Sequence, residues 1–546
     1  MQRLLLLLVL VVWMGGDSAP PRPIALPSAQ RLSLFAAGYA LIVLIPALWS
    51  RVLARYVAVG NLHRSLGRFL IGTQVARMLI PAWFAVGVFA LGWVDIVYRA
   101  LDPIRNVPMD LPAAMLGTLP AMLAWMGLWW AAYPADRALR EQSLLLQLQD
   151  GLPIHAPPGF WSYFSANLRM QLLFTVVPVA LILLFRDLTA VSLSWGFGID
   201  LRAAKLGSDS ATEAAKVIEW VLIPLSAATV FVLAPEILRR VLQTQPLPDS
   251  ALRRRLEEMC RRSGLRYRDI LLWRTGNNMG NAAVMGVVPQ VRYILLSDLL
   301  LETMTDQQIE AVFAHEAGHV VHRHLAWYGA FVIITIGVQL MIAKVADVFD
   351  IKLLFVPGWL RDPLILALAV GGLFLTFGFL SRWFERQADV YAARTMEREL
   401  TAGAGVRVSD LPVVAAAVPT GAAAVAAVNA GPLMTLLAPS DVIESVPRAS
   451  AAATAKSESP TTHVGQRGAA IFASALRRVA VVNNIPVAAR NFSHGSIADR
   501  VNYLQHLSAS PERTLRFDRL MGVLYTGLTV ALSISVMWVG ILMWRG

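Results

Sequence analysis

Two histidines and one glutamate near the middle of the chain have the spacing of a metal site. The sequence from position 315 reads His-Glu-Ala-Gly-His, so His315 and His319 are four residues apart and Glu316 follows the first of them. On a helix, residues four apart share one face, and two imidazoles on one face can bind a single zinc ion. Glu316 would then stand beside the ion, where its carboxylate can take a proton from water. The motif indicates zinc-dependent hydrolysis, and a pair of satisfied helix histidines is the alternative.

A catalytic zinc site needs a third protein ligand. The chain has one cysteine, Cys260, which excludes a disulfide framework and a cysteine-rich zinc site. The best candidate is Glu385, within Ser-Arg-Trp-Phe-Glu-Arg-Gln-Ala-Asp at positions 381–389. Asp389, one helical turn later, could accept the second ring N–H of a ligand histidine and fix its tautomer. The alternative for Glu385 is an interfacial carboxylate that pairs with a nearby arginine.

The residues before the motif predict the helix that must position it. Thr305 can cap its N-terminus with Gln308 as the capping-box partner, and Ile309, Val312 and Phe313 form an apolar helical face. The motif falls in the last turns of this helix, just before an apolar segment, so the metal would lie close to the membrane surface. Two further histidines at this basic helix end are interpreted as ordinary interfacial residues: His322 and His324.

The composition is that of a membrane protein. Of the 546 residues, 56% are hydrophobic and 15% are charged, and the mean hydropathy is +0.56. A soluble domain has about 25% charged residues, so an ordinary soluble enzyme is excluded. The net charge of +12 does not require nucleic acid as a partner, because the cytoplasmic loops of membrane proteins are rich in lysine and arginine.

Eight segments approach the roughly 20 apolar residues that a membrane span needs. They are Leu32–Trp49, Met78–Tyr98, Leu111–Tyr133, Met170–Phe185, Val217–Leu238, Leu325–Ala343, Pro363–Leu380 and Met521–Trp544. The first connection contains four arginines and no acidic residue, which marks it as cytoplasmic: Arg51, Arg55, Arg64 and Arg68. Counting spans from there places both large connections that carry candidate site residues on the cytoplasmic face.

These features predict the following organisation along the chain: a signal-like segment (1–31), an N-terminal transmembrane region of about five spans (32–238), a first catalytic part with the motif helix (239–324), a transmembrane hairpin (325–380), a third-ligand helix (381–400), an Ala-rich low-complexity linker (401–464), a second catalytic part (465–519) and a C-terminal transmembrane helix (520–546).

The sequence resembles the integral-membrane zinc metallopeptidases that include the CAAX prenyl proteases and the heat-shock membrane protease HtpX, within the gluzincin clan. The resemblance runs from about Leu252 to Leu300, through the motif helix to the Ser-Arg-x-x-Glu-x-x-Ala-Asp segment, and again over about Gln466–Leu504. It implies one Zn²⁺ per chain and assigns a role to four residues: His315, His319 and Glu385 as ligands and Glu316 as general base.

The resemblance also implies residues that handle the substrate. Asn281, Ala282 and Ala283 would belong to an edge strand that holds the substrate backbone, between the strand-like stretches 270–273 and 293–296. An edge strand without a ligand is the alternative. His494, with Arg500 downstream, would help to stabilise the transition state, although Gly495 stands where the family has proline. A surface-loop histidine is the alternative there.

We therefore expect a mainly α, polytopic membrane protein with about eight transmembrane helices and a small α+β zinc-metallopeptidase (gluzincin) domain at the cytoplasmic face. The predicted function is endopeptidase cleavage of membrane-associated or misfolded polypeptides. The predicted location is the lipid bilayer of a bacterial cytoplasmic membrane. The alternatives are a signal-transducing membrane metalloprotease of the antibiotic-sensor type, a non-proteolytic transporter or channel, and a catalytically dead scaffold. The sequence indicates neither a natural substrate nor an oligomeric state.

Overall fold

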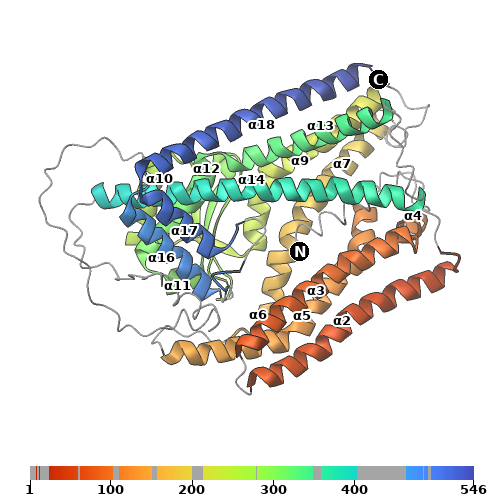
Figure 1. Cartoon of the computed structure of the whole chain (residues 1–546). Coiled ribbons are helices and arrows are strands. Elements are labelled where there is room, and N and C mark those ends of the chain that lie inside the picture. Colours follow the sequence, from red (N-terminus) through yellow and green to blue (C-terminus); the bar gives the residue numbers. More distant parts are fainter. Residues whose placement is uncertain are drawn as a thin grey trace, which may run out of the picture. The chain divides into compact units, whose positions relative to one another are not determined.

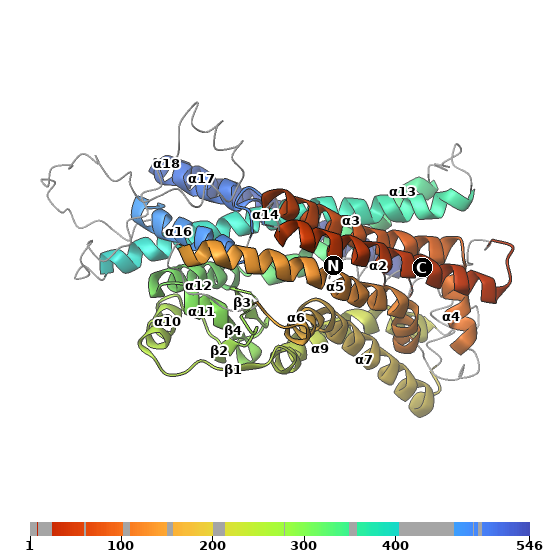
Figure 2. The ribbon, with the colours of Figure 1, turned by 90° about the horizontal axis from the view of Figure 1, so that it is seen from below.

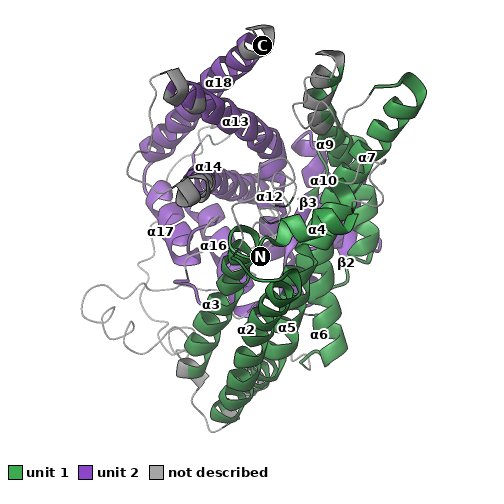
Figure 3. Ribbon diagram, turned by 90° about the vertical axis from the view of Figure 1, so that its right-hand side faces the viewer, with its two compact units in different colours: residues 1–245, 273–278, 285–293 green, residues 246–272, 279–284, 294–546 purple. Residues whose placement is uncertain are grey.

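The structure is a computed structural model. It describes residues 8, 12, 24–58, 62–101, 110–149, 157–199, 213–277, 279–348, 358–402, 463–483, 485–489 and 494–545. The signal-like segment lies mostly outside these residues. Of the Ala-rich linker, only the first two and the last two residues are described. The chain divides into two compact units, shown in green and purple in Figure 3. The first unit is mainly residues 1–245, and the second is mainly residues 246–272 and 294–546.

The first unit is a bundle of long apolar helices. Its helices are α2 (Ser28–Ala58), α3 (Leu62–Phe89), α4 (Trp93–Leu101), α5 (Asp110–Gln149), α6 (Phe160–Asn167), the π-helix η2 (Leu168–Leu173), α7 (Phe174–Phe197) and α9 (Glu213–Val241). Helices α2, α3 and α5 lie side by side (Figure 2). The backbone of α3 approaches α2 closely: a Cβ at Gly38 would lie 2.1 Å from the Trp83 ring, and one at Gly87 would lie 2.2 Å from Phe35.

Six helices in the described part of the chain are long and apolar enough to cross a membrane. They cover Ser28–Val57, Ser65–Phe89, Asp110–Gln142, Phe160–Phe197, His324–Ile342 and Pro511–Ile541. The two other expected spans fall on α9 and α14 (Gly358–Ala402), in which not every side chain is described. The number eight therefore stays a prediction, but the chain is a multi-pass membrane protein.

The expected second span, Met78–Tyr98, was misplaced. The apolar helix there runs over Ser65–Phe89, and Gly92, with φ of +64°, separates it from the short helix α4. Glycine adopts this left-handed conformation at little cost, so the chain can end one helix and begin another at this point. The apolar run in the sequence continues across a break in the helix.

A small sheet and eight helices make up most of the second unit. The strands are β1 (Thr244–Pro246), β2 (Asp269–Trp273), β3 (Ala282–Met285) and β4 (Tyr293–Ser297), in the order β1-β2-β4-β3. The 3-10 turn η3 (Pro289–Val291), which precedes β4 in the sequence, belongs to the first unit. The helices are α10 (Ala251–Arg262), α11 (Asp298–Thr303), α12 (Asp306–Val321), α13 (His324–Val348), α14, α16 (Gln466–Val482), α17 (Ile497–Ser508) and α18 (Pro511–Arg545). Helix α13 packs along α18 (Figure 1).

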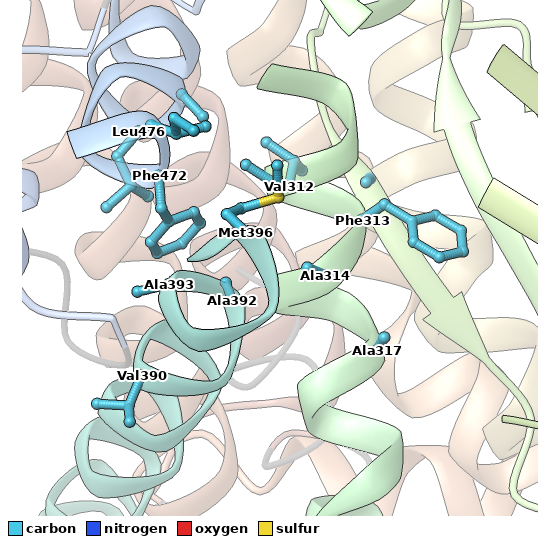
Figure 4. Packing of buried hydrophobic residues seen from close by; sticks show 14 of the residues in the cluster. Val312, Phe313, Ala314, Ala317, Val390, Ala392, Ala393, Met396, Phe472 and Leu476 are labelled. Carbon is cyan, nitrogen blue, oxygen red and sulfur yellow. The ribbon is translucent and has the colours of Figure 1, made fainter. Parts of the chain in front are cut away.

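The hydrophobic core of the second unit holds α12, α14 and α16 together. Figure 4 shows Met396 of α14 between Val312 of α12 and Phe472 of α16, whereas Phe313 points to the opposite side of α12. Helix α16 approaches α14 so closely that a Cβ at Gly468 would lie 2.1 Å from the carbonyl oxygen of Ala393. This packing fixes α12 and α14, the two helices that carry the candidate metal ligands, relative to each other.

Candidate metal centre

Helix α12 begins and ends as the sequence predicts. The Thr305 hydroxyl accepts a hydrogen bond from the Gln308 N–H (3.3 Å), and the Gln308 side chain accepts one from the Thr305 N–H (3.2 Å). The predicted capping box is thus confirmed. The helix continues to Val321, so His315 and His319 are one turn apart on one face, and their Nε2 atoms lie 3.3 Å from each other.

Helix α14 brings Glu385 to this pair. One carboxylate oxygen of Glu385 lies 3.5 Å from Nε2 of His315, and the other lies 3.7 Å from Nε2 of His319. One donor atom from each of the three side chains can be chosen so that all lie within 4.8 Å of one another. Glu385 follows His319 by 66 positions, and the segment between them includes α13 and the first part of α14.

The chemistry of these donors fits a divalent cation. Oε2 of Glu385 is buried and has no hydrogen-bond partner among the described residues, which is costly for a charged oxygen unless a cation neutralises it. Burial lowers the pKa of His319 to about 3, so its imidazole is neutral and can offer a lone pair. Two imidazoles and one carboxylate are a common ligand set for catalytic zinc. The residues present therefore fit a zinc ion.

Asp389 and Arg500 form a buried ion pair next to the ligands. The Arg500 guanidinium donates to both carboxylate oxygens of Asp389, at 2.9 and 2.5 Å. Oδ1 of Asp389 also lies 3.0 Å from Nδ1 of His315. Burial opposes ionisation of Asp389, but Arg500 and His315 together lower the pKa of its carboxyl. Burial also opposes a charge on His315, but Asp389 and then Glu385 raise the pKa of its imidazole to about 9.

His494 lies in the turn before α17 and contacts the third candidate ligand. Its Nδ1 is 2.8 Å from Oε1 of Glu385, and its side chain is 50% exposed. Burial works against the charge on Glu385, but the contacts with His315 and His494 lower the pKa of this carboxyl well below its ordinary value. An exposed imidazole at the edge of the site is accessible to a substrate.

Glu316 lies between the metal ligands and the edge of the sheet. Burial raises the pKa of its carboxyl to about 7, while a hydrogen bond from the Val284 backbone N–H favours the ionised form. Val284 belongs to β3, the strand at one end of the sheet. The expected substrate-handling residues lie here: Ala282 and Ala283 are in β3, and Asn281 directly precedes it.

The backbone before β3 is held at two successive residues. The Asn281 carbonyl accepts a hydrogen bond from the Ser297 N–H (3.0 Å), and the Asn281 N–H donates one to the Ser297 hydroxyl (2.8 Å). The Asn483 side chain accepts from the N–H of Gly280 (3.0 Å) and donates to its carbonyl (2.7 Å). Sequence reasoning missed Asn483, because nothing in its surroundings indicates a contact with a residue 203 positions earlier.

The interpretation of His324 as an ordinary interfacial residue was wrong. Its side chain is buried, with 1% of the residue exposed, and its Nδ1 lies 2.9 Å from Nδ1 of His319. The basic sequence around it, His-Arg-His, indicated solvent. The signal available in the sequence was the spacing of five residues from His319, which becomes meaningful when the helix ends between the two.

Comparison with known proteins assigns this region to a family. Residues 246–507 match the model of peptidase family M48. This segment is the part of the chain that is similar to peptidase family M48. The M48 segment contains β2 to β4 and the last residue of β1, together with α10 to α14, α16 and nearly all of α17, and therefore every candidate site residue described above. The predicted family of membrane zinc metallopeptidases is confirmed.

Two relatives give the extent of the similarity. A protease HtpX homolog from Aeropyrum pernix is 29% identical over 160 residues, which are 28% of this chain and 50% of the relative. The chain thus spans about half the length of the curated relative that it matches. The crystal structure of Ste24p from S. mikatae aligns with 85% of this chain and 98% of its own, at 12% identity and a TM-score of 0.30. A TM-score at that level does not establish a shared fold.

Proposed function

We propose that this M48 protein is a zinc-dependent endopeptidase that cleaves membrane-associated or misfolded polypeptides at the cytoplasmic membrane face. One observation carries the proposal: His315, His319 and Glu385 converge on one point, with the carboxylate of Glu316 next to them. The family match to a peptidase domain supports the same conclusion. Bound at this point, zinc would polarise the scissile carbonyl and lower the pKa of a water molecule towards 7.

Glu316 is the proposed general base. Its carboxyl has a pKa raised to about 7 by burial, so it can accept a proton from water and release it to the leaving amine at neutral pH. The N–H of Val284 holds this carboxylate beside the edge strand. Asp389 and Arg500 would keep His315 oriented, and His494, at the exposed rim, would meet the developing oxyanion.

The edge strand is the proposed binding site for the substrate backbone. Strand β3 has a neighbour on one side in the sheet, and its Val284 contacts Glu316. An extended polypeptide that pairs with such an edge would place its backbone carbonyls along the site, with weak selection for side chains. Asn281, Ala282 and Ala283 would supply backbone groups at the start of this strand.

The location of the site supports a membrane-associated substrate. The apolar span His324–Ile342 begins five residues after His319, so a ligand lies next to a membrane-crossing helix. The arginine-rich connection before it, which includes Arg253, Arg254 and Arg255, is typical of the cytoplasmic side. A polypeptide anchored in the bilayer would therefore reach the site without leaving the membrane.

The test uses the full chain purified in detergent. We expect about one zinc per chain, and cleavage of β-casein that stops with a chelator and returns when zinc is added. Glu316→Gln should retain zinc but lose at least about 100-fold in cleavage rate, because a general base contributes about 10²–10⁴-fold. Glu512→Gln, the same change at an exposed position in α18, is the matched control and should cleave like the wild type.

Two results would refute the proposal: undiminished cleavage by Glu316→Gln, or wild-type protein that contains no zinc. His315→Ala should lose the metal. Mass spectrometry of products from a pool of detergent-solubilised membrane proteins would then identify cleaved bonds, and internal cuts would distinguish an endopeptidase from an enzyme that trims chain ends.

A further inference from the structure

We infer that His324 positions the candidate zinc ligand His319, and that Gln387 fixes the proton arrangement of this histidine pair. Among the described residues, these two form a hydrogen-bonded chain that ends on the ligand: Nδ1 of His324 lies 2.9 Å from Nδ1 of His319, and Nε2 of His324 lies 2.9 Å from Oε1 of Gln387. The inference rests on the proposed function, because it assumes that His319 binds zinc.

A break in the helix makes the contact between the two histidines possible. Residues five apart on a continuous helix do not face each other. Here α12 ends at Val321, and Arg323 adopts φ of +55° before α13 begins at His324. A non-glycine residue in this left-handed region is strained. The strained turn directs the ring of His324 back onto His319, away from solvent.

The chain of hydrogen bonds determines which nitrogen of His319 is free. Oε1 of Gln387 is an acceptor, and it also accepts from the Tyr525 hydroxyl at 2.5 Å. Nε2 of His324 must therefore carry the proton and donate to Gln387. A neutral His324 then has an unprotonated Nδ1, which accepts from Nδ1–H of His319. His319 is left with a lone pair on Nε2, the atom that faces His315 and Glu385.

Aromatic packing holds the ring of His324 in this orientation. It stacks on Phe384 with parallel planes, 2° apart, and ring centroids 4.4 Å apart. Phe384 is fully buried and directly precedes Glu385. The ring therefore cannot rotate freely, and its two nitrogens stay aligned with their partners. Partners of this kind around a metal-binding histidine set the ring orientation and tautomer, and their loss weakens metal binding by about 10–100-fold.

The test compares variants that keep or lose a single acceptor. His324→Leu removes both nitrogens, while His324→Asn keeps a carbonyl oxygen that can accept from Nδ1–H of His319. Gln387→Leu removes the acceptor, and Gln387→Glu retains it as a carboxylate. Tyr328→Phe is the matched control: it removes a partly buried hydroxyl that donates to Ser381 and does not belong to the hydrogen-bonded chain, on a ring that packs against Phe384.

The primary measurement is the zinc dissociation constant, obtained by competition with a chelator of known affinity. We expect His324→Leu and Gln387→Leu to weaken zinc binding by about 10–100-fold, and His324→Asn and Gln387→Glu to recover most of the loss. The visible absorption bands of the Co²⁺-substituted protein should change in the two leucine variants, because they report ligand geometry. Tyr328→Phe should match the wild type in both measurements.

Thermal unfolding of the metal-free proteins separates a positioning role from a general loss of stability. Wild-type zinc affinity in His324→Leu would overturn the inference. Equal losses of zinc affinity in Gln387→Leu and Gln387→Glu would also overturn it. A wild-type chain that binds no zinc would overturn both this inference and the proposed function. Zinc binding that depends on His324, in a protein that cleaves no polypeptide, would refute the proposed function and leave the positioning role intact.

Discussion

Arg500 offers the sharpest test of the electrostatics around the site. Its guanidinium forms two hydrogen bonds with Asp389, whose side chain is 2% exposed, and lies 3.9 Å from Glu385. Arg500→Gln leaves two buried carboxylates without their cationic partner. Removal of one member of a buried ion pair costs about 3–5 kcal/mol. With about 2–4 °C of melting temperature per kcal/mol for a domain of this size, the apparent midpoint should fall by roughly 6–20 °C.

The assay is thermal unfolding of the detergent-solubilised protein, followed by tryptophan fluorescence, with zinc and with a chelator. The midpoint should fall further in the presence of the chelator, because bound zinc supplies positive charge to the same carboxylates. Adding Asp389→Asn to Arg500→Gln removes the unpaired charge and should recover part of the loss. Arg467→Gln, at an exposed position of α16, serves as control. A midpoint for Arg500→Gln within the error of wild type, in both conditions, would refute the reasoning.

Three other predictions concern the support of the site. Gly468→Ala should lower the unfolding temperature by the equivalent of about 1–3 kcal/mol, because its Cβ would meet the Ala393 carbonyl at 2.1 Å. Asn483→Ala should raise KM for a peptide more than it lowers kcat, since two hydrogen bonds to Gly280, worth about 1–3 kcal/mol together, hold the edge strand; an unchanged KM would contradict this. Burial raises the pKa of the Cys260 thiol to about 12, so iodoacetamide at pH 8 should label the unfolded protein and spare the folded one.

Local interactions explain what the sequence could predict. The helix around His315 depends on contacts between residues three or four apart, and its capping box and apolar face are visible in the sequence. The strands on either side of Ala282 were also recognisable from their local composition. Strands β2 and β4 cover the two stretches that the sequence predicts. The general placement of the apolar helices followed from composition as well, because membrane spans must be long and apolar.

Contacts between distant segments explain what the sequence could not predict. The burial of His324 depends on the left-handed turn at Arg323 and on the return of α14 after a helical hairpin, and neither is encoded in the residues beside it. Asn483 acts on a strand 203 residues away. That Glu385 meets the two histidines was predicted from a motif and a count of spans, and the structure brings these side chains together. Whether they bind zinc stays a prediction.

Helix α14 supports His319 from two sides. Glu385 lies next to Nε2 of His319, and Gln387, two residues later, reaches its Nδ1 through His324. On a helix, residues two apart point in nearly opposite directions, so one helix can serve both sides only because the ring of His324 spans the remaining distance. Because His319 belongs to α12, a shift of α14 along its axis would disturb both the contact at Nε2 and the chain of hydrogen bonds at Nδ1. The geometry around His319 therefore depends on the packing that fixes α12 and α14 relative to each other.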